Sequence, residues 1–552
     1  MTIGSIRQAL FADAPLRRNA VLWLAVALCG GALAGWAEGR RDLLWLLLIG
    51  IPLALLAAID LFQTSHSLRR NYPGSARIRW LLEGLRPFSR AYFVESEVEG
   101  RPFSHEDRAL IYARAHGTAD AHPFGTQLDV YSDEYEWLAH SMAPNPGADR
   151  DMRVTVGSRQ CSQPYSASRL NISAMSFGAL GGNAIEALNL GAKLAGCYHD
   201  TGEGGLSPYH EKHGGDLVWQ VASGYFSCRD RQGRFDPAMF ADRAAHPSVK
   251  MIEIKLSQGA KPGHGGMLPA AKVTAEIADI RGIAQGEDCI APPGHSAFST
   301  PRELVEFAAR LRELSGGKPV GIKLCVGLPH ELFAVAKAML ASGIVIDFVV
   351  VDGAEGGTGA APKELSDRVG MPLRDGLVIA RNALVGAGLK GDVRLAASGK
   401  VTSGASVAIN AALGADWCNA ARPFMFSLGC IQSLKCNTGL CPTGIATQSP
   451  ARQRGIVVPE KAQRVERFHR TTLNALHEII VAAGMDSPSD MRPSHLRQRI
   501  NVAEMRQLDE LYHFARPGEL VAGSDDPVLR RWWDAADPDS FRRSDGDRLA
   551  LT

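Results

Sequence analysis

Between Leu170 and Ala420, short apolar or β-branched runs alternate with glycine-rich loops and with stretches of helical periodicity. Such alternation predicts a parallel sheet whose strands are joined by helices. The number of units over this length suits a closed barrel better than an open sheet. We therefore predict an α/β fold built on a (β/α)8 TIM barrel. The predicted strands are Leu170–Ala174, Gly196–His199, Met251–Leu256, Val320–Val326, Ile346–Val351, Arg394–Ala397 and Trp417–Ala420, with one more near Val218–Ala222.

Three segments between these strands are predicted as helices. Pro301–Leu314 follows Ser299 and Thr300 and carries proline in its first turn, which is typical of a helix start. Glu331–Ala341 and Leu377–Val385 have apolar residues spaced by three and four. In a barrel, the loops that follow the strands share one face, so chemistry is expected in those loops.

Two apolar segments lie near the N-terminus, Val21 to Trp36 and Leu43 to Ile59. Each is close to the roughly 17–25 residues that a spanning helix needs. A signal peptide is the main alternative for the first segment, but no small-residue cleavage site separates the two from the rest. A buried or monotopic helical pair is the other alternative. We predict a transmembrane hairpin over residues 1–70.

Basic residues flank this hairpin on both sides, and the loop between the segments carries only Arg40 and Arg41. The positive-inside rule then places both ends in the cytoplasm. We expect the protein in the inner, cytoplasmic membrane, with its catalytic domain facing the cytoplasm. The flanking residues are Arg7, Arg17 and Arg18 before the hairpin and Arg69, Arg70, Arg77 and Arg79 after it.

The remaining chain divides into a connecting region (71–150), the barrel (151–490) and a C-terminal tail (491–552). A length of 552 residues accommodates one large barrel with appendages. The net charge of +2, without a basic run interleaved with aromatic residues, gives no reason to expect nucleic acid. Ten cysteines without a regular even pattern favour a reducing compartment over a disulfide framework.

Three of the cysteines, Cys430, Cys436 and Cys441, lie in one loop at a Cys-x5-Cys-x4-Cys spacing. Soft sulfur ligands that can converge on one point suit an iron–sulfur cluster or zinc. The spacing is not that of a zinc ribbon. Three ligands suggest a cluster with one iron fewer than the cubane, whereas the simplest alternative is a set of buried structural thiols.

Glycine-rich loops follow the first and the last predicted strands. Met175 and Ser176 lie in a loop of small residues that would let a flat ring approach the backbone. Gly356-Gly357 and Ser398-Gly399, each followed by a helix, make a candidate phosphate cradle, although a glycine loop alone most often only makes a turn. No Gly-x-Gly-x-x-Gly opens a dinucleotide-binding unit, so the loops favour FMN.

Charged residues also lie where the barrel should open. Lys255 and Lys323 interrupt apolar strands, where an unpaired charge is costly, so each should meet a flavin or a structural carboxylate. Glu203 places a carboxylate in a glycine loop. Lys261 and Arg281 are two separated cations that suit a dicarboxylate, or that simply face solvent. The spacing of three further histidines fits no metal site: His210, His213 and His295.

Taken together, these motifs resemble the FMN-binding synthase domain of the glutamate synthases. The resemblance runs in the family's order from about Arg153 to about Met491, and the cysteine spacing equals the family's [3Fe–4S] site. The matching segments are Ile172–Gly178, Thr201–Gly205, Gln258–Gly263, Gly356–Gly359 and the three-cysteine loop that ends in Gly444–Gln448.

The resemblance implies that 2-oxoglutarate, or a similar 2-oxo acid, and ammonia or a small amine form an imine, to which reduced FMN delivers hydride. It implies that the cluster passes single electrons to the flavin. The residue roles that follow are Lys323 and Glu203 as catalytic residues, Lys261 and Arg281 on the substrate carboxylates, Met175, Ser176 and Lys323 at the flavin, Gly356, Gly357, Ser398 and Gly399 on its phosphate, and Cys430, Cys436 and Cys441 on the cluster.

The chain also departs from the family's pattern. His264, Met267 and Ala270 replace a glutamate, a glutamine and a glycine in the segment that contains the substrate lysine. The chain begins Met1-Thr2-Ile3, without an N-terminal cysteine nucleophile, and no pyridine-nucleotide domain is recognisable. Ammonia and electrons are therefore expected from outside, the latter from a donor protein or a membrane carrier, and a homo-oligomer is compatible with the sequence. The alternative functions are a membrane-linked flavin dehydrogenase of an amino or hydroxy acid and a non-catalytic electron relay or scaffold.

Overall fold

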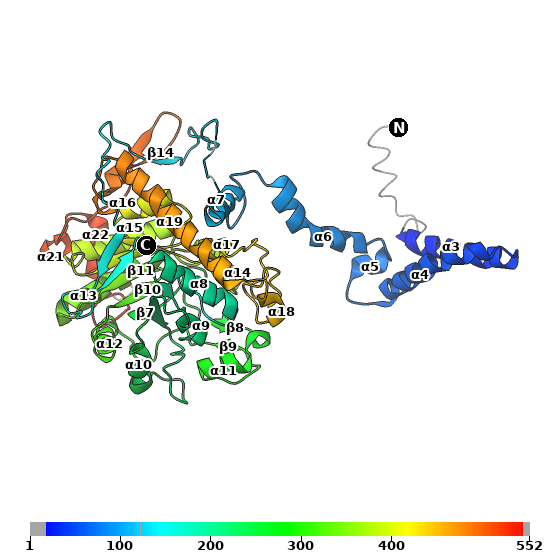
Figure 1. The fold of residues 1–552 in the computed structure, drawn as a ribbon, viewed down its shortest axis with the longest axis horizontal. Helices are drawn as coiled ribbons and strands as arrows, with labels where there is room; N and C mark the ends of the chain where they lie inside the picture. Colours follow the sequence, from blue (N-terminus) through cyan, green and yellow to red (C-terminus); the bar gives the residue numbers. More distant parts are fainter. Residues whose placement is uncertain (1–17, 119, 122, 545–552) are drawn as a thin grey trace, which may run out of the picture. The chain divides into compact units, whose positions relative to one another are not determined.

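The computed structural model describes residues 18–118, 120–121 and 123–544 (Figure 1). The chain forms two compact units that divide between His105 and Glu106. The first contains the two apolar segments, and the second contains the barrel and the C-terminal residues.

The apolar segments of the first unit are helical. They form α3 (Ala20–Ala37), then a 3-10 turn, η1 (Arg41–Leu46), and α4 (Leu47–Phe62). By length and composition both stretches could cross a membrane, and only 17% and 11% of their residues are buried, unlike the core helices of a soluble domain. This is weak evidence for membrane association. Arg7 and Arg17 lie outside the described residues, and the predicted orientation stays a prediction.

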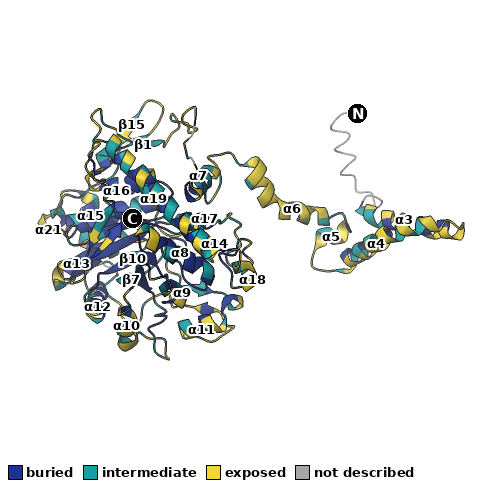
Figure 2. Cartoon of the chain, in the orientation of Figure 1, coloured by how far each residue is buried: buried dark blue, intermediate teal, exposed yellow. Residues whose placement is uncertain are grey.

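Four shorter elements follow the apolar helices. They are α5 (Ser67–Asn71), α6 (Arg77–Ser89), the π-helical turn η2 (Arg90–Val94) and α7 (His105–His116). The residues of α5 and α6 are largely exposed (Figure 2).

Eight parallel strands close into a barrel in the second unit, as the sequence predicts. The barrel closes where β13 pairs with β4. The pairing of β7 with β10 places Lys255 opposite Lys323. Helices surround the strands in Figure 1. The strands are β4 (Leu170–Ile172), β5 (His199–Asp200), β6 (Leu217–Val221), β7 (Val249–Lys255), β10 (Val320–Leu324), β11 (Phe348–Asp352), β12 (Arg394–Ser398) and β13 (Trp417–Ala420).

The largest boundary error concerns the second strand, predicted at Gly196–His199. Gly196 is instead the left-handed C-cap of helix α8, with φ 66°. Glycine is the residue that adopts this conformation without a steric cost, and it commonly ends helices. The strand therefore begins only at His199.

The predicted helices are confirmed as parts of the outer layer. Helix α12 starts with a capping box in which Thr300 and Glu303 satisfy each other's backbone N–H groups. The helices of this layer are α8 (Gly182–Ala195), α9 (Pro208–Glu211), α10 (Pro237–Ala244), α11 (Ala275–Arg281), α12 (Pro301–Leu314), α13 (Pro329–Ser342), α14 (Lys363–Arg368), α15 (Leu373–Gly386), α16 (Gly404–Ala412), α17 (Arg422–Ser427), α18 (Pro450–Gln453) and α19 (Val458–Ala482).

The hairpin of β2 (Arg153–Val156) and β3 (Tyr165–Ser168) covers the end of the barrel where the strands begin. Its Val156 and Tyr165 pack with Phe348 and Trp417 in one buried apolar cluster. This end is therefore filled by side chains, and open space for a ligand remains at the carboxyl ends of the strands.

Segments that the sequence left unassigned come together in a small antiparallel sheet. It consists of β1 (Glu136–Leu138), β14 (Leu496–Arg499) and β15 (Met505–Gln507). The connecting region and the C-terminal residues are thus joined to each other, and an ion pair between Glu136 and Arg374 attaches them to α15. The remaining elements are the short pair β8 (Met267–Leu268) and β9 (Cys289–Ile290), the 3-10 turns η3 (Ala270–Lys272), η4 (Pro488–Asp490) and η5 (Pro493–His495), and the helices α20 (Leu508–Leu511), α21 (Glu519–Ala522) and α22 (Pro527–Ala535).

A buried ion pair connects α12 to the barrel. Arg312 donates to Asp347 Oδ2 at 3.0 Å from Nε and 2.8 Å from Nη2. The same carboxylate accepts from the backbone N–H groups of Val320 and Ser158. Asp347 is fully buried, so its charge depends on these four donors.

We predict that Arg312→Ala lowers the free energy of unfolding by about 3–5 kcal/mol, because it leaves a buried carboxylate without its countercharge. Urea unfolding followed by circular dichroism measures the change. Arg310→Ala, at an exposed position two residues away on the same helix, is the matched control and should cost less than about 1 kcal/mol. Equal effects of the two variants would contradict this assignment.

Candidate active site at the carboxyl ends of the barrel strands

A pocket opens at the carboxyl ends of the strands. It collects residues within β6, β10, β11, β12 and β13 and residues in the loops that follow β4, β7, β11, β12 and β13, so several separate loops contribute to one wall. Lys323, Gly356, Gly357, Ser398 and Gly399 are all in this wall, as the sequence analysis expects of flavin-binding residues. The other lining residues are Ser173, Ala174, Gln220, Gln258, Asp352, Lys400, Asn419, Ala420, Ala421, Arg422 and Pro423.

Lys323 is the cation at the bottom of this pocket and is 4% exposed. Its Nζ lies 4.0 Å from Asp352 Oδ1. Burial opposes the charge on Lys323, but the surrounding carboxylates outweigh that effect and raise the pKa of the ammonium. Lys323 therefore stays protonated and can stabilise negative charge in the pocket.

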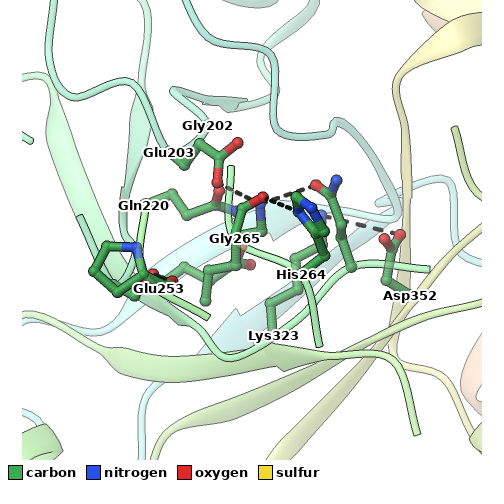
Figure 3. Close-up of polar contacts among 12 residues, drawn as sticks. Gly202, Glu203, Gln220, Glu253, His264, Gly265, Lys323 and Asp352 are labelled. Atoms are coloured by element: carbon green, nitrogen blue, oxygen red, sulfur yellow. Dashed lines mark hydrogen bonds and ion pairs between the residues drawn. The ribbon is translucent and has the colours of Figure 1, made fainter. Parts of the chain in front are cut away.

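Two carboxyl groups lie deeper, Asp200 on β5 and Glu253 on β7 (Figure 3 shows Glu253 with Lys323 and Asp352). Burial, and then the charge of Glu253, raise the pKa of Asp200 well above its ordinary value. Glu253 accepts a 2.6 Å hydrogen bond from Gln220 Nε2, and burial raises its pKa too. The pair can therefore hold a proton close to Lys323.

Glu203, in the loop after β5, forms a second centre of charge. Its Oε2 accepts from Lys255 Nζ at 2.8 Å. Burial opposes the carboxylate, but Lys255, then Lys261 and Arg281, outweigh burial and lower the pKa of Glu203 to about 2. A Cβ at Gly266 would lie 2.4 Å from Glu203, so glycine is needed where this loop crosses the carboxylate.

Lys261 and Arg281 lie around Glu203, and both are almost completely buried. The alternative that they simply face solvent is therefore wrong. Arg281 donates to the carbonyl of Phe177 at 3.2 Å and stands over the ring of Phe226, while its Nε is buried without a hydrogen-bond partner. Burial lowers the pKa of Lys261, and Glu203 only partly offsets that effect.

The pocket fits a phosphate-bearing flavin on two observations. The Nε2 of Gln258 lies in the pocket wall, buried and without a hydrogen-bond partner, while its Oε1 accepts from Lys255 at 2.9 Å. A Cβ at Gly357 would lie 2.7 Å from the Arg422 side chain, so only glycine lets the backbone come this close to the guanidinium. An unused amide donor and a glycine loop against a cation are what an anionic, hydrogen-bonding ligand requires.

Met175 and Ser176 are buried but do not line this pocket. They follow Ser173 and Ala174, which do. The carbonyl of Met175 lies 3.3 Å from His210 Nε2, so this loop is supported from behind.

The histidines have structural partners. His213 pairs with Glu186, and His295 contacts Tyr225 and the carbonyl of Lys255. Burial lowers the pKa of both His210 and His295 to about 4. Among the described residues, no group of three or more histidine, cysteine, aspartate or glutamate side chains is placed to hold one metal ion.

The three-cysteine loop follows α17, whose first residues line the pocket. The thiols of Cys430, Cys436 and Cys441 are close enough to influence one another's ionisation, but they do not converge as ligands of a single ion. That arrangement does not supply a zinc site, which needs four ligands around one point. A polynuclear cluster places different demands on the thiols, because each thiolate binds a different iron.

The surroundings of the three thiols differ. Burial raises the pKa of Cys430 to about 12 and also raises that of Cys436. Burial opposes the thiolate of Cys441 as well, but hydrogen bonds from Thr443 and from backbone N–H groups lower its pKa below the ordinary value. Gln432 and Leu434 have φ values of 54°, an unfavourable conformation for residues with side chains that is typical of ligand-holding loops.

Two residues from distant segments hold the three-cysteine loop, and sequence reasoning missed both. Lys272 donates to the carbonyls of Ala179 (2.7 Å) and Cys436 (3.3 Å), and burial lowers its pKa to about 8. The Tyr112 hydroxyl, on α7, donates to the carbonyl of Cys430. No local pattern could have found Tyr112, which lies 318 residues before its partner.

Gln220, Glu253 and Asp352 are three further residues of this site that were not predicted from the sequence. The signal was available, because polar residues interrupt the apolar runs of β6 and β7 just as Lys255 and Lys323 do. A buried polar residue in a parallel strand has to be paired, so each of these interruptions points to the same polar end of the barrel.

The fold and the site together define a parallel α/β barrel whose strand ends carry a glycine-lined pocket beside a cluster of buried cations. The family model described as the conserved region in glutamate synthase matches residues 142–486. The chain belongs to this family. A relative from Bacillus subtilis, "Glutamate synthase large subunit-like protein YerD", is 35% identical over 84% of this chain and 97% of that protein.

Further relatives are named as glutamate synthases. "Archaeal glutamate synthase [NADPH]" of Methanocaldococcus jannaschii is 36% identical over 59% of this chain and 61% of that protein. The match thus spans about three fifths of the archaeal protein. Among solved structures, a mandelate oxidase variant "with the monooxide FMN adduct" is 14% identical, covers 77% of this chain and 99% of its own, and has a TM-score of 0.39. That likeness is too low to support an inference.

We predict that Glu203→Gln destabilises the protein at pH 7, because it removes the anion that balances three buried cations. The pKa of Glu203 lies below that of an unfolded glutamate, about 4.3. Its contribution is therefore fully present above the unfolded value and is lost as pH falls through the folded value. The difference in unfolding free energy between the wild type and the variant should shrink between about pH 5 and pH 2.

Chemical unfolding at a series of pH values measures this difference. Glu287→Gln, at an exposed position, is the control and should show no comparable trend. A difference for Glu203→Gln that stays constant down to pH 2 would contradict the assigned role.

Proposed function

We propose that this chain is an FMN-dependent oxidoreductase of the glutamate synthase type, which reductively aminates 2-oxoglutarate or a similar 2-oxo acid with ammonia or a small amine. The observation that carries the proposal is the joint presence of a glycine-lined pocket above Lys323 and a buried cation cluster beside it. Membership of the glutamate synthase family supports the same reaction.

FMN, when bound in this pocket, supplies the hydride. The Gly356-Gly357 and Ser398-Gly399 loops would hold its phosphate, with Arg422 behind the first of them. The free amide of Gln258 would donate to the ring. Lys323, kept protonated by the carboxylates around it, would stabilise negative charge on the reduced ring.

Lys261 and Arg281 would bind the carboxylates of the 2-oxo acid. In the ligand-free protein the carboxylate of Glu203 balances these cations, so the substrate enters a site already adapted to an anion. The carbonyl carbon first exchanges its oxygen for nitrogen, which releases water. The imine carbon then gains a hydride and the nitrogen gains a proton. Glu203, which is paired with Lys255 among these cations, would position the amine.

We further propose that Cys430, Cys436 and Cys441 bind a [3Fe–4S] cluster that passes electrons to the flavin. The donor chemistry of three thiols in one loop fits such a cluster. The loop is held by Lys272 and Tyr112, and the unfavourable backbone at Gln432 and Leu434 is consistent with a ligand-holding role. Electrons would come from a donor protein or a membrane carrier.

We predict that reduced, purified protein is oxidised only when 2-oxoglutarate and ammonium are both present. Anaerobic stopped-flow spectroscopy of the flavin band measures this step. Lys261→Ala should lower kcat/KM by about 10–100-fold, because it removes a charge-assisted contact worth about 1.5–3 kcal/mol. Lys193→Ala, an exposed lysine on α8, is the matched control.

No flavin oxidation by this pair, together with reduction of the oxidised protein by glutamate, would contradict the proposal. That result would favour the membrane-linked dehydrogenase instead. Unchanged turnover in Lys261→Ala would remove Lys261 from the substrate site.

We predict that Cys436→Ser loses iron and the visible absorbance of the cluster but still binds FMN, because the pocket is built from other loops. Iron analysis and flavin fluorescence after denaturation measure the two cofactors separately. Cys161→Ser, a cysteine far from this loop in the sequence, is the control and should keep both. Full iron content in Cys436→Ser would contradict the ligand assignment.

A further inference from the structure

Helix α6 carries an apolar face that no described residue of its own unit covers. Five of its large apolar side chains are between 47% and 62% exposed. At 100° per residue they fall on one side of the helix, whereas Arg79, Glu83 and Arg86 fall on the other. The face consists of Ile78, Leu81, Leu82, Leu85 and Phe88.

The start of α6 is fixed to the ends of both apolar helices. Arg77 donates to the fully buried carboxylate of Asp60, on α4, from Nε at 2.9 Å and from Nη2 at 2.7 Å. The backbone N–H of Gly74 donates to the same carboxylate at 3.0 Å. A Cβ on Gly74 would lie 2.6 Å from Val21, near the start of α3, so glycine permits this close packing.

Helix α6 therefore begins where α3 starts and α4 ends. Trp80 fixes its rotation, because its ring lies 5.6 Å from that of His66 and beneath the guanidinium of Arg69. With Trp80 and Arg77 committed to the rest of the unit, the apolar face remains directed away from these partners.

The charges of this segment are strongly one-sided. Between Gln63 and Val94 the chain has six arginines and a single acidic residue, Glu83. Cations beside an exposed apolar helix face are typical of helices that lie in the interface of an anionic bilayer. Tyr92 and Phe93, which follow the helix, are also exposed and suit the headgroup level.

We propose that α6 is an interfacial helix that lies in the surface of an anionic lipid bilayer, with its apolar face in the acyl boundary and its arginines at the headgroups. The occupant of the face is thus the membrane that α3 and α4 would enter. The inference does not depend on the proposed reaction, because it concerns a different unit and different residues.

Photo-crosslinking in full-length protein tests the proposal. The crosslinking residue p-benzoyl-phenylalanine replaces Leu82 on the apolar face or, as the matched control, the neighbouring Glu83 on the opposite face. Both positions are exposed, so neither substitution disturbs packing. The protein is reconstituted in vesicles of phosphatidylethanolamine and phosphatidylglycerol, irradiated, and analysed by mass spectrometry for lipid adducts.

We expect several-fold more lipid adduct at position 82 than at position 83, and a lower yield at position 82 in vesicles of phosphatidylcholine alone. Equal yields at the two positions, or none at either, would overturn the proposal. Adducts at position 82 to a second copy of the chain would overturn it too, by assigning the face to a protein interface. A yield that does not depend on the anionic lipid would overturn the role of the arginines.

Discussion

Everything at the carboxyl end of the barrel depends on the balance of buried charge. Lys323 is almost completely removed from water, and its ammonium is retained only because carboxyl groups surround it. The carboxylate of Glu203 keeps its negative charge for the converse reason, because cations surround it. Because each group compensates another, the two centres are specified together. Replacing one member leaves the others buried without their partners.

The sequence predicts the barrel well because its strands are buried on both sides. Such strands are short continuous apolar runs, and each of the predicted runs corresponds to a strand. The same property makes Lys255 and Lys323 conspicuous, since a charge in such a run has to be balanced. The boundary of β5 was wrong because Gly196 was assigned to the strand, although a glycine that follows a helix more often ends it.

The rest could not be predicted because it depends on contacts between distant segments. β1 pairs with β14, and both are too short to show a periodicity. Tyr112 supports the three-cysteine loop from a helix that precedes the barrel. The burial of Lys261, in a loop, and of Arg281, at the end of α11, is likewise a tertiary property, because the composition of both segments is equally compatible with solvent. The sequence identifies these residues as candidates, but it does not distinguish a buried position from one that faces solvent.

The connections between the pocket and the three-cysteine loop restrict how the two could work together. Helix α17 begins with Arg422 at the pocket wall and ends just before Cys430. Its six residues span about 9 Å at 1.5 Å per residue. Lys272 joins the same three-cysteine loop to the segment that carries the buried cations Lys261 and Arg281. If the loop binds a cluster as proposed, the cluster is therefore linked both to the pocket wall and to the segment of Lys261 and Arg281. If the proposed cluster and flavin are bound, this short connection, supported from two sides, favours electron transfer within one rigid site over transfer between parts that move independently.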